Sequence, residues 1–518
     1  MLSEKNRGDP TEFFRLMKIS WLWVLFVSIS ILGIVMGILS YYLQLKYGEI
    51  VTGLRTPGAG GVAWGLYVVF IIFFVGISFG GISTSAAVRI LGISQLKPIT
   101  RVAEFITIVS LILAAMCVLA DQGRVIIALI NLPRYARVAS PMFGTFTMVI
   151  AGYLFASLVY FFLSTRSDAY ELSKRTKGVI KIIYKIWASG FKGTPEDFER
   201  HSKVSFWLAI FILPMLVTAH STLGFIFGLH PGRPGWFSAL QAPSFVIMAG
   251  ISGIGLIIAC AYILNKIYKN SIPPETIRTL GNILMFLTIT YIYLMIVEEL
   301  TANYAAPRKD REIAHTIVFG PYAPYFWITV ISLTISFLIL FYQFVSGRTL
   351  LVSTVISGFL VNVAAFTKRF VLVVPSQTHG FFIPYPEGQY NITMVEILVV
   401  IGIVSFGLLA FLVFAKFFPL IPLEAAGLVE IPKTLPSQKK RNILRLSATF
   451  GTLLFGLSLM AIGFISSARA FTKYYLDPII PIAPFIFIIG IIVSFLSAVV
   501  YEIIPEKQMM NSSLSKEQ

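Results

Sequence analysis

Cysteine is nearly absent from this chain of 518 residues, which holds only Cys117 and Cys260. Both lie within apolar runs. Two thiols build neither a disulfide framework nor the four-cysteine ligand set of an iron–sulfur cluster. Any iron–sulfur cluster that works with this chain must therefore sit in a partner.

Histidine is scarce as well, with 5 residues in the whole sequence. A pair of membrane haems, each held by two histidines, needs four imidazoles at membrane depth. His201, His230, His315 and His379 fall in polar connections, and only His220 lies within an apolar run. No second histidine or cysteine stands at ligand spacing near it, so we predict neither a haem nor a metal site in this chain.

Charge is low: charged residues make up 13% of the sequence, against 57% hydrophobic residues. A soluble domain carries about 25% charged residues. Apolar runs of about 20 residues recur, long enough to cross a hydrocarbon core of about 30 Å, and the short alternating segments of a membrane barrel are missing. The sequence predicts an all-α, polytopic membrane bundle of about twelve transmembrane helices, at 19–45, 62–88, 102–120, 142–164, 204–229, 242–264, 280–300, 324–346, 350–367, 394–415, 446–466 and 480–503.

The basic residues are distributed unevenly among the predicted connections. Lysine and arginine number 41 against 24 acidic residues, for a formal net charge of +17. About two thirds of these cations lie in the two termini and the even-numbered connections, and such cations accumulate on the cytoplasmic side. We therefore expect both termini to be cytoplasmic, in the plasma membrane of a prokaryote. Topology and attraction to lipid headgroups explain the positive charge, so no nucleic acid partner is expected.

The longest polar connection, residues 165–203, contains the stretch "GVIKIIYKIW". Apolar residues recur there at helical spacing beside lysines, which is typical of a helix on the inner leaflet: Val179, Ile182, Ile183, Ile186 and Trp187, next to Lys181 and Lys185. A solvated loop is the alternative, and the sequence does not decide between the two. The last two predicted helices hold almost no ionisable residue, so we expect them to pack against the bundle or face lipid.

Ionisable residues within the apolar runs are few, and each costs about 2.5 kcal/mol or more at the bilayer centre. With the amino terminus inside, most of them fall toward the outer face: Asp121, His220, Glu298, Glu299, Lys368, Arg369 and Glu396. The inner half offers mainly Arg89 and Glu104. Each has a structural alternative, such as a satisfied bundle histidine or a snorkelling lysine. Their gathering at one face favours a functional site.

The chemistry at this face suits a quinone, whose carbonyls need hydrogen-bond donors and whose reduction takes up protons with electrons. A histidine with its unperturbed pKa of about 6.5 can donate to a carbonyl and then pass a proton, which a carboxylate can replace. His220, Asp121 and Glu298 supply these groups if they are neighbours. The Gly/Pro break that follows, "GLHPGRPGW", would give a flat headgroup an entrance between helices.

Five sequence blocks occur in an order that resembles the NrfD/PsrC family, the quinone-reactive membrane subunits of polysulfide reductases, alternative complex III and related complexes. The blocks are "VAWGLYVVFIIFFVGISFGG", "DQGR", "AHSTLGFIFGL" with "PGWFSALQAPSFVIMAGISG", "EELTANY", and "KRFVLVVPSQT" with "IPYPEGQYNITMVEI". The resemblance covers residues 62–415. It implies two adjacent four-helix bundles with peripheral helices, and a quinone site near the outer face.

Carried onto this sequence, the resemblance assigns roles to particular residues. The catalytic set is His220, Asp121 and Glu298. The expected quinone-binding set is His220, Asp121, Tyr304, Arg124 and Trp236. Support of the site or contact with a partner is expected of Arg369, Ser376, Tyr390 and Glu396. Two positions depart from the family pattern, because Lys368 stands where many relatives have an acid and Phe79 replaces a histidine that some members carry.

The resemblance also implies a function and a division of the chain. We expect a subunit of a respiratory oxidoreductase that exchanges electrons between the quinone pool and a ferredoxin-like iron–sulfur partner, alongside a molybdopterin or other redox catalytic subunit. Such a chain is not catalytic alone. The expected parts are the amino terminus with the first helix, the NrfD-like quinone-binding core, a basic cytoplasmic linker, and two extra helices with the tail: 1–61, 62–415, 416–445 and 446–518.

Two further hypotheses stay open from the sequence. A secondary transporter is the alternative, because twelve helices with both termini inside is a common transporter arrangement. The long inner connection after helix four, rather than after helix six, disfavours two six-helix halves. Proton translocation is an extension of the main hypothesis, with Glu104 and Glu299 on the expected path.

Overall fold

The computed structural model describes residues 19–54, 62–135, 146–267, 272–378, 390–425, 443–469 and 482–504. Within these ranges the chain is helical and has no strand, and twelve helices are long and apolar enough to cross a membrane, as predicted. The long helices are α2 (Trp21–Tyr47), α3 (Leu66–Leu91), α4 (Thr100–Asp121), α6 (Phe146–Arg175), α8 (Pro195–Gly228), α9 (Gln241–Ile267), α10 (Pro274–Tyr304), α12 (Ala323–Ser346), α13 (Leu351–Val373), α15 (Met394–Phe417), α16 (Ile443–Arg469) and α17 (Ala483–Ile503). The chain is a multi-pass integral membrane protein.

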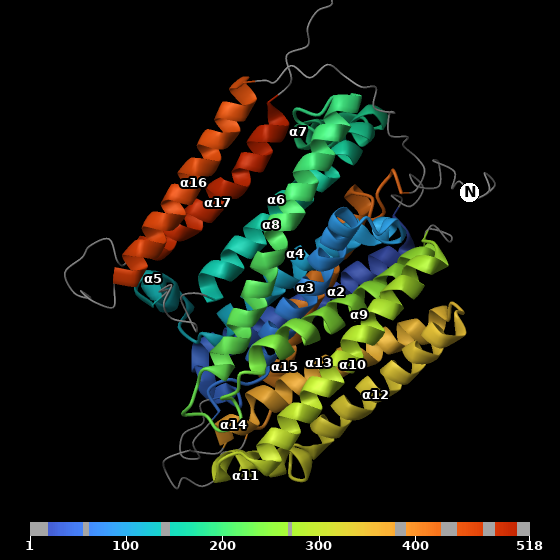
Figure 1. Cartoon of the computed structure of the whole chain (residues 1–518). Helices are drawn as coiled ribbons and strands as arrows, with labels where there is room; N and C mark the ends of the chain where they lie inside the picture. The colour runs from blue at the N-terminus through green and yellow to red at the C-terminus, as the bar shows by residue number, and fades with distance from the viewer. Residues whose placement is uncertain are drawn as a thin grey trace, which may run out of the picture.

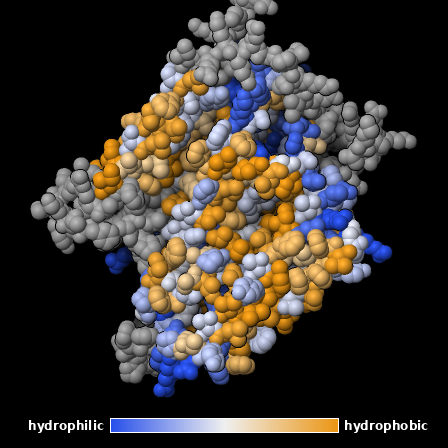
Figure 2. Space-filling view, viewed as in Figure 1, coloured by the Kyte–Doolittle hydropathy of each residue, from blue (hydrophilic) through white to orange (hydrophobic). Residues whose placement is uncertain are grey.

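Shorter helices lie at the two ends of the long ones, as Figure 1 shows. We call the two ends the α7 end and the α11 end. The α7 end holds η3 (Ser94–Ile99) and α7 (Gly178–Trp187), and the α11 end holds η2 (Glu49–Val51), α5 (Val125–Tyr135), α11 (Arg308–Val318) and α14 (Pro375–Thr378). Figure 2 shows hydrophobic side chains across the middle of the molecule and hydrophilic ones toward its ends, as a bilayer requires.

Eight of the long helices form two rings of four. The first bundle is α3, α4, α6 and α8, and the second bundle is α9, α10, α12 and α13. In each bundle every helix packs against two others, and α3 and α9 pack together at the junction. The pair α2 and α15 lies against α4, and the pair α16 and α17 lies against α6 and α8. This arrangement confirms the expected two bundles with peripheral helices.

Glycine sets the spacing where the two bundles meet. A Cβ atom placed on Gly80 of α3 would lie 2.5 Å from the backbone of Gly253 in α9, and the reverse distance is also 2.5 Å. The two helix backbones are therefore in direct contact, because no side chain larger than hydrogen fits between them. Gly255 and Gly358 make a similar approach between α9 and α13.

The final helix pair is anchored by a buried ion pair that sequence reasoning missed. Glu502, in the last turn of α17, pairs with Arg166 of α6, and both side chains are buried. His201 of α8 places Nδ1 3.0 Å from the same carboxylate. The pair holds few ionisable residues, as expected, but the sequence did not show the partner of Glu502, because Arg166 lies 336 positions away.

The connection 165–203 is mostly helical. α6 continues to Arg175, and α8 begins at Pro195 behind a capping box formed by Thr194 and Asp197. Between them lies α7, so the structure has a helix where the sequence allowed either an amphipathic helix or a loop.

Candidate functional site

His220 lies inside the first bundle, on the face of α8 that points toward α3. Its side chain is buried, with an exposed fraction of 1%. Nδ1 lies 2.9 Å from the carbonyl oxygen of Leu216, and Nε2 lies 2.8 Å from that of Val75 in α3. The ring of Phe79 meets the imidazole edge to face, with centroids 4.8 Å apart. The imidazole is thus enclosed by protein and does not face lipid.

The two hydrogen-bond partners of His220 are both acceptors. A neutral imidazole carries one N–H and one lone pair, so it can satisfy only one carbonyl at a time. The other nitrogen gains a hydrogen bond only if the ring takes up a second proton. A doubly protonated ring would complete both hydrogen bonds, at the cost of burying a positive charge.

Phe79 is the residue of α3 whose ring contacts the imidazole of His220 directly. It therefore forms an apolar wall on this side of His220. A histidine at position 79, which the sequence resemblance allowed, would instead form a pair with His220.

A second polar cluster lies at the α11 end of the second bundle. Lys368 of α13 places Nζ 2.9 Å from Oε2 of Glu298 in α10. The Gln241 side chain, at the start of α9, donates to Oε1 of the same carboxylate at 3.3 Å. Lys368 is buried, so it forms an ion pair within the protein rather than snorkelling to the surface.

Arg369, next to Lys368 on α13, is a buried cation. Its guanidinium lies over the ring of Phe245, 4.3 Å from the centroid. It is near enough to Glu298 and to His220 for its charge to act on both. His220 and Glu298 bond to different partners, so they belong to separate polar groups.

An aromatic cluster lies next to Arg369, made of Trp64, Phe227, Trp236 and Phe245. Trp64 and Trp236 are stacked, with centroids 5.6 Å apart. Trp236 is buried and its Nε1 donates to the carbonyl of Leu372 at 2.7 Å. This placement gives the predicted binding residue Trp236 a fixed orientation.

Gln377 of α14 holds Trp64 in place and was missed by sequence reasoning. Its Oε1 accepts from the backbone N–H groups of Ala63 and Trp64, each at 3.0 Å, and its Nε2 donates to the carbonyl of Trp64 at 2.8 Å. The only signal for it was its position within the "PSQT" block. A buried amide that closes three backbone bonds fixes the entry to α3.

Asp121 lies apart from His220, at the end of α4 that faces α2 and α15. It is buried. Beside it, Gln44 donates to the carbonyl of Ala120 at 2.9 Å and accepts from the hydroxyl of Tyr67 at 2.7 Å. The structure thus places Asp121 in a different polar group from Glu298.

Glu396 and Tyr390 join the start of α15 to the start of α3 through hydrogen bonds. The carboxylate of Glu396 accepts from the Tyr390 hydroxyl at 2.6 Å and from the backbone N–H of Gly53 at 2.9 Å. Tyr390 in turn accepts from the backbone N–H of Leu66. Burial and the adjacent carboxylate raise the pKa of the Tyr390 phenol, so it remains a donor. Both residues support the helix packing.

The remaining predicted residues are not gathered around His220. Tyr304 is 90% exposed at the end of α10, and Arg124 is exposed at the start of α5. Glu299 is partly buried and faces Asn303. Ser376 is buried in α14, and its hydroxyl has no hydrogen-bond partner in the described part of the chain.

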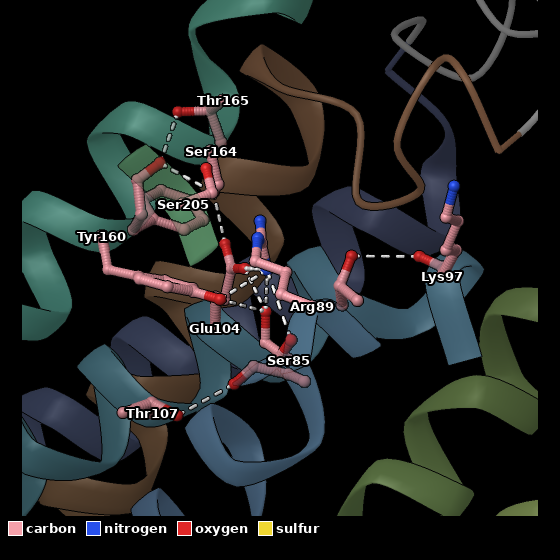
Figure 3. A network of polar contacts seen from close by, with 12 residues as sticks. Ser85, Arg89, Lys97, Glu104, Thr107, Tyr160, Ser164, Thr165 and Ser205 are labelled. Atoms are coloured by element: carbon pink, nitrogen blue, oxygen red, sulfur yellow. Dashed lines mark hydrogen bonds and ion pairs between the residues drawn. The ribbon is translucent and has the colours of Figure 1, made fainter. Parts of the chain in front are cut away.

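A third polar cluster occupies the α7 end of the first bundle (Figure 3). Glu104 of α4 pairs with Arg89 of α3 at 3.2 Å and accepts from Ser85 at 2.5 Å. Arg89 also donates to the hydroxyl of Tyr160 at 2.6 Å, and Ser164 donates to Glu104. Glu104 is buried. Among the described residues, its carboxylate contacts the guanidinium of Arg89 and the hydroxyls of Ser85 and Ser164.

Between this cluster and His220 lies a middle layer of hydroxyls. Tyr153 and Thr107 both donate to the carbonyl of Ser78, at 2.9 and 3.0 Å. The Ser78 hydroxyl donates to the carbonyl of Val75, the same oxygen that faces His220. Polar groups therefore occur at three levels inside the first bundle. The sequence signal was the spacing of seven between Ser78 and Ser85, and between Tyr153 and Tyr160.

Residues 164–168 of α6 bond to three neighbouring helices, α4, α7 and α17. Ser164 donates to Glu104, Thr165 accepts from Trp187 of α7, Arg166 pairs with Glu502, and Asp168 pairs with Arg101. We call residues 164–168 the α6 turn.

Residues 56–380 match the protein family described as "Polysulphide reductase, NrfD". The chain belongs to the NrfD family. The matched residues include all eight helices of the two bundles, whereas α16 and α17 lie outside the match. Within the described residues, no group of three or more His, Cys, Asp or Glu side chains is placed to hold a metal ion.

Three relatives of this NrfD chain carry names. It is 27% identical over 420 residues to a putative membrane subunit of dimethyl sulfoxide reductase from Halobacterium salinarum, covering 77% of this chain and 91% of the relative. It is 27% identical over 366 residues to a selenate reductase subunit of Mesobacillus selenatarsenatis, covering 69% and 83%. It is 24% identical over 443 residues to an Hdr-like menaquinol oxidoreductase integral membrane subunit of Archaeoglobus fulgidus, covering 82% and 97%.

Proposed function

We propose that this NrfD chain is the quinone-reactive membrane subunit of an oxidoreductase complex. It exchanges electrons between the quinone pool and an iron–sulfur partner docked at the α11 end. The names of the relatives support this role, since two are named as subunits of reductases and one as a menaquinol oxidoreductase subunit. The distribution of lysine and arginine supports an outer position for the α11 end.

The observation that carries the proposal is the placement of His220. A quinone takes up or releases two protons as it exchanges two electrons. The aromatic cluster and the Arg369 guanidinium support the proposal, because a quinone site needs flat apolar walls and a hydrogen-bond donor. A doubly protonated His220 would keep an acceptor at each ring nitrogen, which supports proton exchange at this site. Glu298, toward the α11 end, is our candidate to exchange that proton with the outer side.

Electron transfer requires a second subunit. With only two cysteines, the chain cannot hold an iron–sulfur cluster of its own. We therefore assign electron delivery to an iron–sulfur subunit and the terminal reaction to a molybdopterin or other redox subunit. α10 packs against α11, and α13 packs against α14, on the face where such a partner would approach the aromatic cluster.

Proton translocation is the finer part of the proposal. His220, the middle layer of hydroxyls and the Glu104 cluster form three polar levels in the first bundle. These levels support a proton route toward the α7 end. Glu104 and Glu299 lie in different bundles and at opposite ends, so we assign the route to Glu104 and the hydroxyls above it. We assign no part of this route to Glu299, which lies at the α11 end of the second bundle.

A secondary transporter remains the alternative function, and two features disfavour it. The helices form two bundles of four rather than two halves of six. The junction glycines also bring the bundle backbones into contact, which opposes the rocking of one half against the other that such transporters use.

The test is His220→Ala in the assembled complex, with Phe211→Ala on the exposed face of the same helix, α8, as the matched control. We expect His220→Ala to lower quinone turnover by about 10²- to 10⁴-fold, the usual contribution of a general acid or base. Electron transfer from the partner subunits to a soluble dye should be unchanged in both variants. Near-normal quinone turnover in a fully assembled His220→Ala complex would overturn the assignment.

A further inference from the structure

The short helix α7 presents three different faces. At about 100° per residue, most of its exposed apolar residues fall on one side. Four of them form this apolar face: Val179, Ile182, Ile183 and Ile186, with exposed fractions of 72%, 57%, 50% and 70%. Large aliphatic side chains exposed this far are unfavourable in water. This face therefore needs an apolar environment.

The second face of α7 fixes the helix to the protein. Tyr184 is buried and its hydroxyl donates to the carbonyl of Phe417 at the end of α15. Burial raises the pKa of the Tyr184 phenol to about 12, so it stays a donor at physiological pH. Trp187 donates from Nε1 to Thr165 at 2.9 Å and lies against the ring of Phe418. These contacts set the rotation of α7 about its own axis.

The third face of α7 is basic. Lys177, Lys181 and Lys185 follow one another at intervals of four, and α7 contains no acidic residue. None of the three lysines forms an ion pair with a carboxylate in the described ranges of the chain. Their charges are therefore available to an external anion.

The three faces are roughly a third of a turn apart, as calculated from the helical rotation of about 100° per residue. A helix that lies in the membrane plane beside a protein needs one face for the protein, one for acyl chains and one for headgroups. Figure 1 shows α7 at the end of the long helices, where α6 ends and α8 begins. This is the level at which a membrane boundary is expected.

We propose that α7 is an interfacial helix that binds anionic lipid. The apolar face inserts beside the acyl chains, and Lys177, Lys181 and Lys185 contact headgroup phosphates. Anionic lipid is favoured over a soluble protein as occupant because charge and apolar surface lie on separate faces. A protein partner at the α7 end would have to cover both. The proposal does not depend on the quinone function, and it stands or falls separately.

The first test measures lipid selectivity. The full complex is purified and reconstituted in nanodiscs of phosphatidylcholine with a fraction of phosphatidylglycerol, and retained lipid is measured by native mass spectrometry. The charge variant is Lys181→Gln/Lys185→Gln. The matched control is Lys266→Gln/Arg348→Gln, which removes two exposed cations at the ends of α9 and α12, away from α7. We expect the charge variant to lose preference for phosphatidylglycerol by about fivefold per lysine, and the control to keep it. An unchanged preference in the charge variant would contradict the proposal.

The second test locates the apolar face. In a Cys117→Ala/Cys260→Ala background, single cysteines at Ile183 and Lys185 are exposed to a membrane-impermeant maleimide in phosphatidylcholine/phosphatidylglycerol vesicles. We expect Lys185→Cys to label quickly and Ile183→Cys to be protected. Equal labelling of both would overturn the proposal, because the isoleucines would then face water. Protection of Ile183→Cys that vanishes when the partner subunits are removed would also overturn it, in favour of a protein occupant.

Discussion

The buried pair between Arg166 and Glu502 predicts how strongly α17 is attached. Both side chains are almost fully enclosed, with exposed fractions of 0% and 1%. Removing one partner of such a pair leaves an uncompensated buried charge, at a cost of about 3–5 kcal/mol. Glu502→Gln keeps an acceptor for Arg166 and should fall near the lower value. Glu502→Ala leaves Arg166 and His201 without this partner and should reach the upper value.

The control is an exposed pair on α8. Lys203 and Glu199 are spaced by four residues, with exposed fractions of 52% and 36%. Pairs of this kind contribute about 0.3–0.5 kcal/mol, so Lys203→Gln should cost roughly a tenth as much as Glu502→Ala.

The assay is the free energy of unfolding of the purified chain in detergent micelles, measured by titration with a denaturing detergent. Limited proteolysis of the connection between α15 and α16 reports separately on release of the final helix pair. Glu502→Ala should speed release, whereas Lys203→Gln should not. The reasoning is refuted if Glu502→Ala costs no more stability than Lys203→Gln.

Two further predictions concern the first bundle and its junction. Glu104→Gln should abolish proton translocation in vesicles while quinone turnover continues, because it removes the buried carboxylate and keeps the shape of the side chain. The control is Glu424→Gln, which changes an exposed acid at the same end. Unchanged translocation in Glu104→Gln would remove Glu104 from the route. Gly253→Ala should lower the stability of the chain by about 1–3 kcal/mol, because its Cβ would meet the backbone of Gly80. Gly451→Ala, where a Cβ meets nothing within 4 Å, should leave thermal unfolding unchanged, and equal effects of the two substitutions would contradict the close contact of α3 and α9.

The number and type of the long helices were predictable because each is a continuous apolar run. The inward position of His220 followed from the same physics, since an imidazole in lipid is unfavourable. Helix ends were less predictable: α8 begins at Pro195, nine residues before its apolar run at 204. The polar residues before 204 give no apolar signal, and the start of α8 is marked by the Thr194 cap and by Pro195 at the first helical position.

The grouping of the polar residues was only partly predictable. Sequence position placed Asp121, His220 and Glu298 toward one face, but it did not show that α3 would separate Asp121 from Glu298. Pairs such as Arg166 with Glu502, or Gln377 with the backbone of Trp64, join segments more than three hundred residues apart. A periodic pattern reports which side of a helix is buried, not which neighbour it meets.

The α6 turn has a consequence for how this chain tolerates insertions and deletions. Ser164, Thr165 and Arg166 point in successive directions and meet α4, α7 and α17 in turn, and Asp168, one turn later, meets α4 again. Adding or deleting one residue before it would rotate every later side chain by about 100° and misdirect all of these contacts together. Selection should therefore remove insertions and deletions in this segment more strongly than point substitutions. The rotation of α6 about its axis should be fixed jointly by its contacts with α4, α7 and α17.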